Sequence, residues 1–261
     1  MRWLWLLGLL MSAGAAHAQT TSQPSDPDAG PTVVFMPRAA LRMSAEHLSG
    51  DDPRFVWDTN FGGEVDLVDY GSGRLTFLGN YQAMLGDEYR NFDPNQGNYV
   101  LAGLSSIRAG GWEVSGVFYH QSRHLSDRPK RGAVDWNMIG GRAERNWIRG
   151  DRRVAIRGDL RKTFLHSFVD YTWEIDSLVR VESAVAPHVG AFGAGGVRVL
   201  GVDGVRNRGT QYGYRAEGGV RLNGRGGATE LFVAMERRID PYQLEFSSVR
   251  WFTVGFRLLS R

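Results

Sequence analysis

Residues 55–69 read FVWDTNFGGEVDLVD, and apolar and polar side chains alternate along this stretch. The odd-numbered positions carry most of the apolar side chains, and the even-numbered positions carry most of the polar ones. The apolar set is Phe55, Trp57, Phe61, Val65 and Leu67, and the polar set is Asp58, Asn60, Glu64 and Asp66. Because successive side chains of a β-strand point to opposite faces of a sheet, this period of two predicts a strand with one apolar and one polar face.

The same period recurs from residue 33 to the end of the chain. The candidate strands cover residues 33–45, 55–69, 74–85, 98–109, 112–124, 134–147, 153–164, 168–185, 190–200, 212–222, 229–238 and 248–259. Pro37 weakens the first of them, so a short helix is the alternative for 33–45. The intervals are too short for α/β units, and the pattern therefore predicts an all-β fold with an even number of strands, about twelve.

The connections between these candidates alternate in length. Short, glycine-rich connections lie near 70–73, 110–111, 149–151, 186–189 and 223–227, and longer ones at 46–54, 86–97, 125–133, 165–168, 201–211 and 239–247. Outer-membrane barrels have short periplasmic turns at one end and longer external loops at the other. We therefore predict a single antiparallel transmembrane β-barrel over residues 33–261.

The two faces of the candidate strands differ in chemistry. One face carries Leu, Val, Phe, Trp and many glycines, and we expect it to contact lipid. The other face is charged, and we expect it to line a lumen that its side chains close. The charged set is Arg142, Glu144, Arg157, Asp159, Arg161, Glu174, Arg180, Glu182, Arg215, Glu217, Arg221, Glu230 and Glu236. Aromatic residues near the strand ends are typical of interfacial girdles, and the candidates are Trp57, Tyr81, Tyr99, Trp112, Trp147 and Trp251.

Residues 1–18 have the three parts of a secretory signal peptide. Arg2 precedes an apolar run from Trp3 to Met11, and Ala16-His17-Ala18 is a small-residue cleavage motif. We expect cleavage after Ala18 and export to the outer membrane, because about ten apolar residues are too few to span a hydrocarbon core of about 30 Å. Residues 19–32 have too little apolar surface to fold, and we expect a disordered N-terminal segment there.

Composition excludes several classes of function. The chain has no cysteine, which excludes disulfide scaffolds, cysteine zinc sites and thiol catalysis. Its formal net charge is +3, and acidic and basic residues are interspersed, so no basic stripe predicts binding to nucleic acid. The expected partners are outer-membrane lipids and, during insertion, the barrel-assembly machinery.

Candidate chemistry is concentrated in residues 119–137. His120, Ser122 and His124 share the parity of the apolar face of 112–124, and Asp135 and Asn137 share that of the apolar face of 134–147. A hairpin folded about residues 128–129 places His120 opposite Asn137 and Ser122 opposite Asp135, with Cβ atoms about 5 Å apart. A hydroxyl, an imidazole and an amide or carboxylate that orients the imidazole are the parts of a base-activated serine nucleophile.

This segment resembles outer membrane phospholipase A, in which a His-x-Ser pair and a following Trp-Asn pair lie on adjacent strands of a twelve-stranded barrel. The matching residues are His120, Ser122, Trp136 and Asn137. The resemblance implies calcium-assisted hydrolysis of phospholipid acyl esters by dimers, on the outward face of the barrel. It assigns Ser122 as nucleophile, His120 as general base and Asn137 as the group that orients His120.

The resemblance covers about 20 residues beyond the shared barrel pattern, and it has departures. The interval from Ser122 to Asn137 is longer here, and His124 stands where the phospholipase has a glycine that helps to form its oxyanion site. Lipid A deacylases of the outer membrane use a similar His-x-Ser pair with an acidic partner. Asp135 is therefore the rival orienting group, and His124 is the rival base.

Three hypotheses for function follow from these patterns. The main interpretation is an outer-membrane barrel that is structural or of unassigned activity. The first alternative is a lipid acyl-ester hydrolase, phospholipase A-like or lipid A deacylase-like, with a lipid-facing Ser-His-Asn site. The second alternative is a pore for small solutes. Calcium is the cofactor to test for a hydrolase, and Asp87, Glu88, Asp93 and Asn95 carry oxygen ligands for it, although their spacing differs from an EF-hand.

Overall fold

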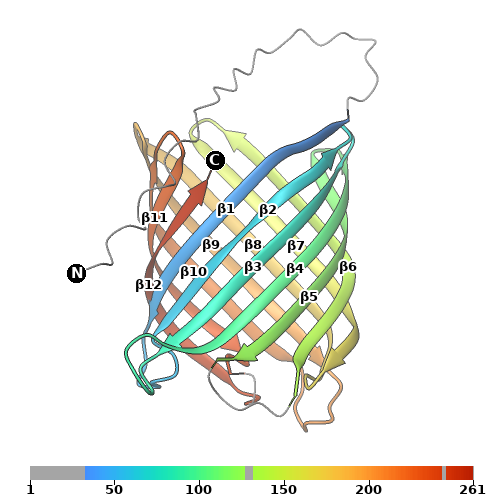
Figure 1. The fold of residues 1–261 in the computed structure, drawn as a ribbon. Coiled ribbons are helices and arrows are strands. Elements are labelled where there is room, and N and C mark those ends of the chain that lie inside the picture. The colour runs from blue at the N-terminus through green and yellow to red at the C-terminus, as the bar shows by residue number, and fades with distance from the viewer. Residues whose placement is uncertain (1–32, 127–131, 243–244, 261) are drawn as a thin grey trace, which may run out of the picture. The chain divides into compact units, whose positions relative to one another are not determined.

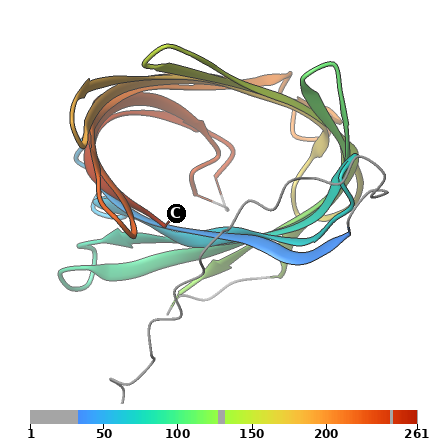
Figure 2. The same ribbon diagram turned by 90° about the horizontal axis from the view of Figure 1, so that it is seen from above.

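The computed structural model describes residues 33–126, 132–242 and 245–260 of the chain. The predicted signal peptide of residues 1–18 and the predicted disordered segment of 19–32 lie outside these ranges. Within them, twelve antiparallel strands form one closed barrel in which every strand pairs with its neighbour in the chain and β1 pairs with β12 (Figure 1). Seen along its axis, the barrel is a closed ring of strands (Figure 2). The predicted fold class is confirmed.

The strands follow the predicted segments along the chain. They are β1 (Val34–Leu48), β2 (Trp57–Asp69), β3 (Arg74–Gly86), β4 (Asp93–Ala109), β5 (Trp112–Leu125), β6 (Val134–Arg149), β7 (Arg152–Ser167), β8 (Tyr171–Ala186), β9 (Val189–Val202), β10 (Gln211–Asn223), β11 (Gly227–Ile239) and β12 (Ser248–Ser260). Among the described residues, no helix is long and apolar enough to cross a membrane.

The first strand passes through Pro37, so the alternative of a short helix over 33–45 is wrong. The register between β1 and β2 shifts between Phe35 and Arg38, and Met36 has a φ of 51°. Proline cannot donate a ladder hydrogen bond, and a β-bulge leaves a residue outside the ladder. The bulge therefore lets β1 keep its pairing on both sides of the proline.

The two ends of the barrel differ as predicted. The end that we call the turn end carries the connections 70–73, 110–111, 150–151, 187–188 and 224–226. The end that we call the loop end, at the bottom of Figure 1, carries 49–56, 87–92, 126–133, 168–170, 203–210 and 240–247. Among the connections of the loop end, the one at 168–170, between β7 and β8, is as short as a turn.

The lumen is filled by ion pairs between arginines and carboxylates. All thirteen charged residues predicted for this face form such pairs. Glu230 is fully buried and accepts hydrogen bonds from Arg180, Arg221 and Arg257 at 2.6, 2.7 and 2.8 Å. A cavity of about 520 Å³, lined by arginines such as Arg42 and Arg157, remains between the pairs.

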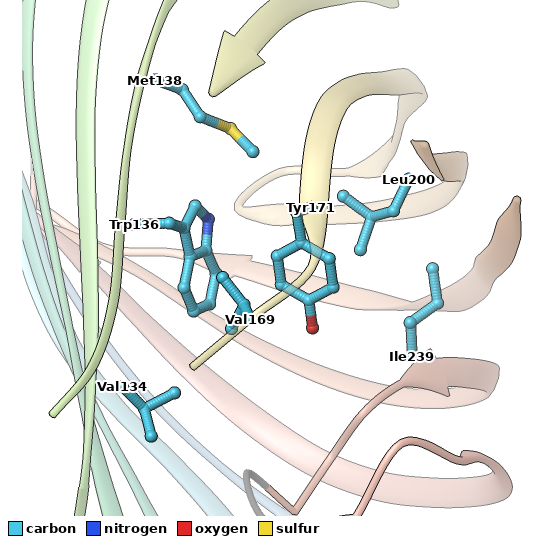
Figure 3. Close-up of a cluster of buried hydrophobic side chains, with 7 residues drawn as sticks. All are labelled: Val134, Trp136, Met138, Val169, Tyr171, Leu200 and Ile239. Atoms are coloured by element: carbon cyan, nitrogen blue, oxygen red, sulfur yellow. The ribbon is translucent and has the colours of Figure 1, made fainter. Parts of the chain in front are cut away.

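Apolar clusters lie inside the barrel toward the loop end. The larger cluster, drawn in Figure 3, consists of Val134, Trp136, Met138, Val169, Tyr171, Leu200 and Ile239. A second cluster contains Leu48, Phe55, Met84 and Trp251. Trp251 is only 3% exposed and packs inside the barrel, so its prediction as an aromatic of the lipid-facing girdle is wrong.

Candidate functional site

The β5–β6 ladder has the predicted register. His120 lies opposite Asn137, and Ser122 lies opposite Asp135. These four side chains are on the outward face and are half-buried. The residues between them, such as Gln121 and Trp136, are buried on the lumen side, as the alternation of a strand requires.

His120 and Asn137 are in direct contact. The distance from His120 Nδ1 to Asn137 Oδ1 is 2.9 Å. An amide oxygen can only accept a hydrogen bond, so this contact is a hydrogen bond in the tautomer that carries its proton on Nδ1. In the neutral ring this leaves Nε2 unprotonated, and Nε2 is the nitrogen that can accept a proton from a nucleophile. The contact therefore orients the ring, and in this tautomer it leaves Nε2 free to act as a base.

Ser122 projects from the same strand as His120, two residues along and on the same face. Residues at this spacing lie about 7 Å apart along a strand. Across the ladders, Ser122 is flanked by Asp135 on β6 and by Tyr99 on β4. Within the described residues, no hydrogen bond joins the Ser122 hydroxyl to His120 or Asp135. The hydroxyl faces outward, where a substrate in the surrounding medium can reach it.

The rival residues occupy different positions around Ser122. The ring of His124 packs edge-on against Tyr99, with centroids 5.4 Å apart. Asp135 lies across from Ser122, one diagonal step away from His120. Of the two candidate orienting groups, Asn137 is the one for which the described structure shows a hydrogen bond to His120. The structure joins His120 to Asn137 by a hydrogen bond, and it places Ser122 two residues from His120 on the same face, opposite Asp135.

Two residues of β4, one of them a predicted girdle aromatic, lie beside the site although the sequence pattern did not place them there. Tyr99 lies opposite Ser122 and Leu101 lies opposite His120 on β4. The Tyr99 ring also packs against Tyr81 on β3, with centroids 4.8 Å apart. The turn at residues 110–111 pairs Ala109 with Trp112. The same antiparallel register, continued along β4 and β5, predicts both of these β4–β5 pairings.

The site lies at one margin of the apolar wall. Ser122 is ten residues beyond Trp112 on β5. At about 3.4 Å per residue and a tilt of about 40°, this separation is about 25 Å along the barrel axis, which is the usual height of the lipid-facing band. Ser122 is therefore at the interfacial depth of the loop end, and Trp112 is at that of the turn end.

The lumen side of the wall behind the site is tightly packed. The Trp136 indole is fully buried, and its ring meets Tyr171 edge-on with centroids 5.2 Å apart (Figure 3). The Arg123 guanidinium lies 5.2 Å from the Trp136 ring and donates a hydrogen bond of 2.6 Å to the backbone oxygen of Asp240. These contacts hold the β5–β6 segment against the barrel interior, and so they fix the backbone from which His120 and Asn137 project.

The described residues do not form a recognisable calcium site. No group of three or more His, Asp or Glu side chains in the ranges that the structure describes converges to hold a metal. Asp93 and Asn95 lie at the start of β4, where the side-chain amide of Asn95 donates to the Arg54 carbonyl and Asp93 pairs with Arg90 at 3.7 Å. These two side chains therefore have structural partners.

Comparison with known proteins identifies the fold. No family model and no curated protein matches the chain. The outer membrane phospholipase of Salmonella typhi, solved as a dimer with bound calcium, superposes with a TM-score of 0.52 at 11% identity, covering 88% of this chain and 92% of its own. Outer membrane phospholipase A from Escherichia coli superposes with a TM-score of 0.53 at 10% identity, covering 87% and 98%. The fold is that of an outer-membrane β-barrel.

Proposed function

We propose that this protein is an outer-membrane hydrolase of lipid acyl esters, with Ser122 as nucleophile, His120 as general base and Asn137 as the residue that positions His120. The observation that carries the proposal is the 2.9 Å contact between His120 Nδ1 and Asn137 Oδ1 on the outward face, two residues from Ser122. The similarity to structures of outer membrane phospholipases supports the same reading.

The residues perform the reaction in two steps. The Ser122 hydroxyl attacks the ester carbonyl carbon while His120 Nε2 takes the hydroxyl proton, and the proton then passes to the departing alcohol. Water next attacks the acyl-enzyme, again with His120 as base, and releases the fatty acid and the free serine.

The depth of the site defines the class of substrate. Ser122 lies at the loop-end margin of the apolar band, where the ester groups of outer-leaflet lipids are found. A lipid reaches it by lateral diffusion and needs no channel through the barrel. We propose that the signal of residues 1–18 directs the chain to the outer membrane, that the mature protein begins at Gln19, and that two copies form the active dimer.

A pore is the weaker hypothesis because the lumen is crowded. Buried ion pairs occupy it, and the apolar clusters of Figure 3 and around Trp251 pack inside the barrel toward the loop end. A structural barrel without activity remains the outcome if hydrolysis is not found.

The decisive experiment measures fatty-acid release by purified protein in mixed micelles of phospholipid or lipopolysaccharide, with and without calcium. Wild-type protein should release fatty acid, and Ser122→Ala should abolish the release. The matched control is Ser105→Ala, an exposed serine on the same face of β4, which should retain activity. Heat-dependent gel mobility verifies that each barrel is folded. An inactive wild type, or an active Ser122→Ala variant, would show that the proposal is wrong.

A further inference from the structure

Three arginines stand together on the outward face of the β6–β7 hairpin at the turn end. They are Arg145 and Arg149 on β6 and Arg152 on β7, and Arg149 lies directly opposite Arg152 in the ladder. On the strands that the structure describes, the other outward-facing acidic, lysine and arginine side chains lie toward the loop end; these are Asp135, Lys162, Arg237 and Arg250. The outward charge of the strands at the turn end is therefore positive and confined to one hairpin.

Arg145 is held in place by aromatic rings. Its guanidinium carbon lies 5.7 Å from the ring centroids of both Trp112 and Trp147, within the range of a cation–π interaction. Gly111 in the adjacent turn has a φ of 80°, and a Cβ atom there would lie 3.5 Å from the Arg145 guanidinium. Two indoles and a turn thus fix the cation on the lipid-facing surface, and both indoles are partly exposed beside it.

These arginines differ from those of the lumen. Arg180 and Arg257 inside the barrel pair with buried carboxylates, whereas among the described residues no carboxylate forms an ion pair with Arg145, Arg149 or Arg152. The cluster lies about 25 Å from the depth of Ser122, at the opposite margin of the apolar band. A guanidinium at the edge of the hydrocarbon layer is stabilised by an anion at the same depth, and phosphate oxygens match its fork of donors.

We infer that this hairpin face, which we call the Arg145 patch, binds the phosphate headgroups of anionic phospholipids in the leaflet at the turn end. Arg145 would contact the phosphate at the hydrocarbon margin, and Arg149 and Arg152 would contact the more polar part of the headgroup. A zwitterionic phospholipid carries an amine that offsets its phosphate, so the patch favours lipids with net negative charge. This binding is independent of the proposed hydrolysis at the other margin of the barrel.

The test measures lipid binding directly. Purified, delipidated full-length protein is titrated with phosphatidylglycerol or phosphatidylcholine, and bound lipid is counted by native mass spectrometry. Each arginine beside an anionic headgroup contributes about fivefold to affinity. The wild type should therefore bind phosphatidylglycerol at least tenfold more tightly than phosphatidylcholine. The triple variant Arg145→Gln, Arg149→Gln, Arg152→Gln should lose most of that preference.

Two further variants make the result specific. Arg250→Gln removes an exposed, outward arginine at the loop end and should leave the preference unchanged. Arg145→Lys retains the positive charge and should keep most of the preference for phosphatidylglycerol. If Arg145 served only to pack between the two indoles, this charge-retaining variant would not be expected to keep it. Equal affinity of the wild type for the two lipids, or an unchanged preference in the triple variant, would overturn the inference. Loss of the preference in Arg250→Gln would overturn it as well.

Discussion

Trp136 and Asn137 are adjacent in β6 and lie on opposite sides of the barrel wall. Trp136 is fully buried in the lumen cluster, and Asn137 accepts the hydrogen bond of His120 outside. The indole packs against Tyr171 and lies beneath the Arg123 guanidinium, so its position is determined by several elements at once. The backbone between the two residues links the packing of the interior to the geometry of the candidate site.

The first prediction concerns this link. Trp136→Ala removes a fully buried aromatic side chain and should lower the free energy of unfolding by about 3–5 kcal/mol. It should also reduce hydrolysis, because β6 loses the packing that holds Asn137 in place. Urea unfolding in lipid vesicles measures the first effect, and fatty-acid release measures the second. Ile139→Ala on the lipid-facing side of the same strand, 60% exposed, is the control and should cost far less stability.

The second prediction separates the two candidate orienting groups. Asn137→Ala leaves His120 without its hydrogen bond and should lower kcat about 100-fold with little change in KM, because misplacement of a base by about 1 Å has a cost of this order. Asp135→Asn removes the rival carboxylate but keeps its shape, and it should leave kcat close to that of the wild type. The opposite pattern would assign the role to Asp135.

Much of the fold follows from the period of two in the sequence. The alternation identifies twelve strands. Once the centre of the β5–β6 hairpin is placed at residues 128–129, antiparallel pairing puts His120 opposite Asn137. Side-chain parity also predicts the charged lumen, where all thirteen predicted residues form ion pairs. These features depend only on neighbours in the chain and on the pleat of a strand.

Features that require three-dimensional packing could not be predicted in this way. Trp251 has the composition of a girdle residue, but it packs in the lumen against Phe55, which belongs to a distant loop. The tautomer of His120 depends on a side-chain contact of 2.9 Å, which no spacing rule specifies. The bulge that carries β1 past Pro37 likewise depends on the partner strand β2.

The third prediction tests the buried charges of the lumen. Glu230→Gln removes the carboxylate that three arginines share, and the guanidiniums of Arg180, Arg221 and Arg257 are then left without its charge. Breaking such a buried network should cost about 3–5 kcal/mol in the free energy of unfolding. Glu245→Gln, which breaks a half-exposed pair with Arg54, is the control and should cost no more than about 1 kcal/mol. Equal effects of the two substitutions would contradict this account.

The fourth prediction concerns conductance. Ion pairs and apolar side chains crowd the lumen, so purified wild-type protein in planar bilayers should show no large, steady single-channel current. Removal of the apolar closure by the double variant Leu48→Ser, Phe55→Ser should increase leak, since both side chains belong to the cluster around Trp251. Steady currents from the wild type would favour the small-solute pore over the closed barrel.

The last prediction concerns pH at the loop end. Arg208 forms ion pairs with Asp170 at 2.5 Å and with Asp240 at 2.9 Å, and so it joins the connections 168–170, 203–210 and 240–247. Burial alone would raise the pKa of Asp170, but hydrogen bonds from Arg208 and its positive charge outweigh burial and lower the pKa of that carboxyl. A carboxyl whose pKa is lower in the folded than in the unfolded state stabilises the fold in its charged form. This stabilisation is fully present above the unfolded pKa, about 3.9, and it is lost as the pH falls from there through the pKa of the folded state.

The loop-end closure should therefore be intact at neutral pH and should loosen below about pH 4. Hydrogen exchange of the 168–170 and 203–210 segments, corrected for the intrinsic effect of pH on exchange, should show more opening below pH 4. Asp170→Asn should show this opening already at pH 7, because it removes the charge that Arg208 binds. The control is Asp51→Asn, an exposed carboxyl in the loop between β1 and β2, which should behave like the wild type at every pH. Protection that stays constant from pH 7 to pH 3 would contradict the role given to the Asp170–Arg208 pair.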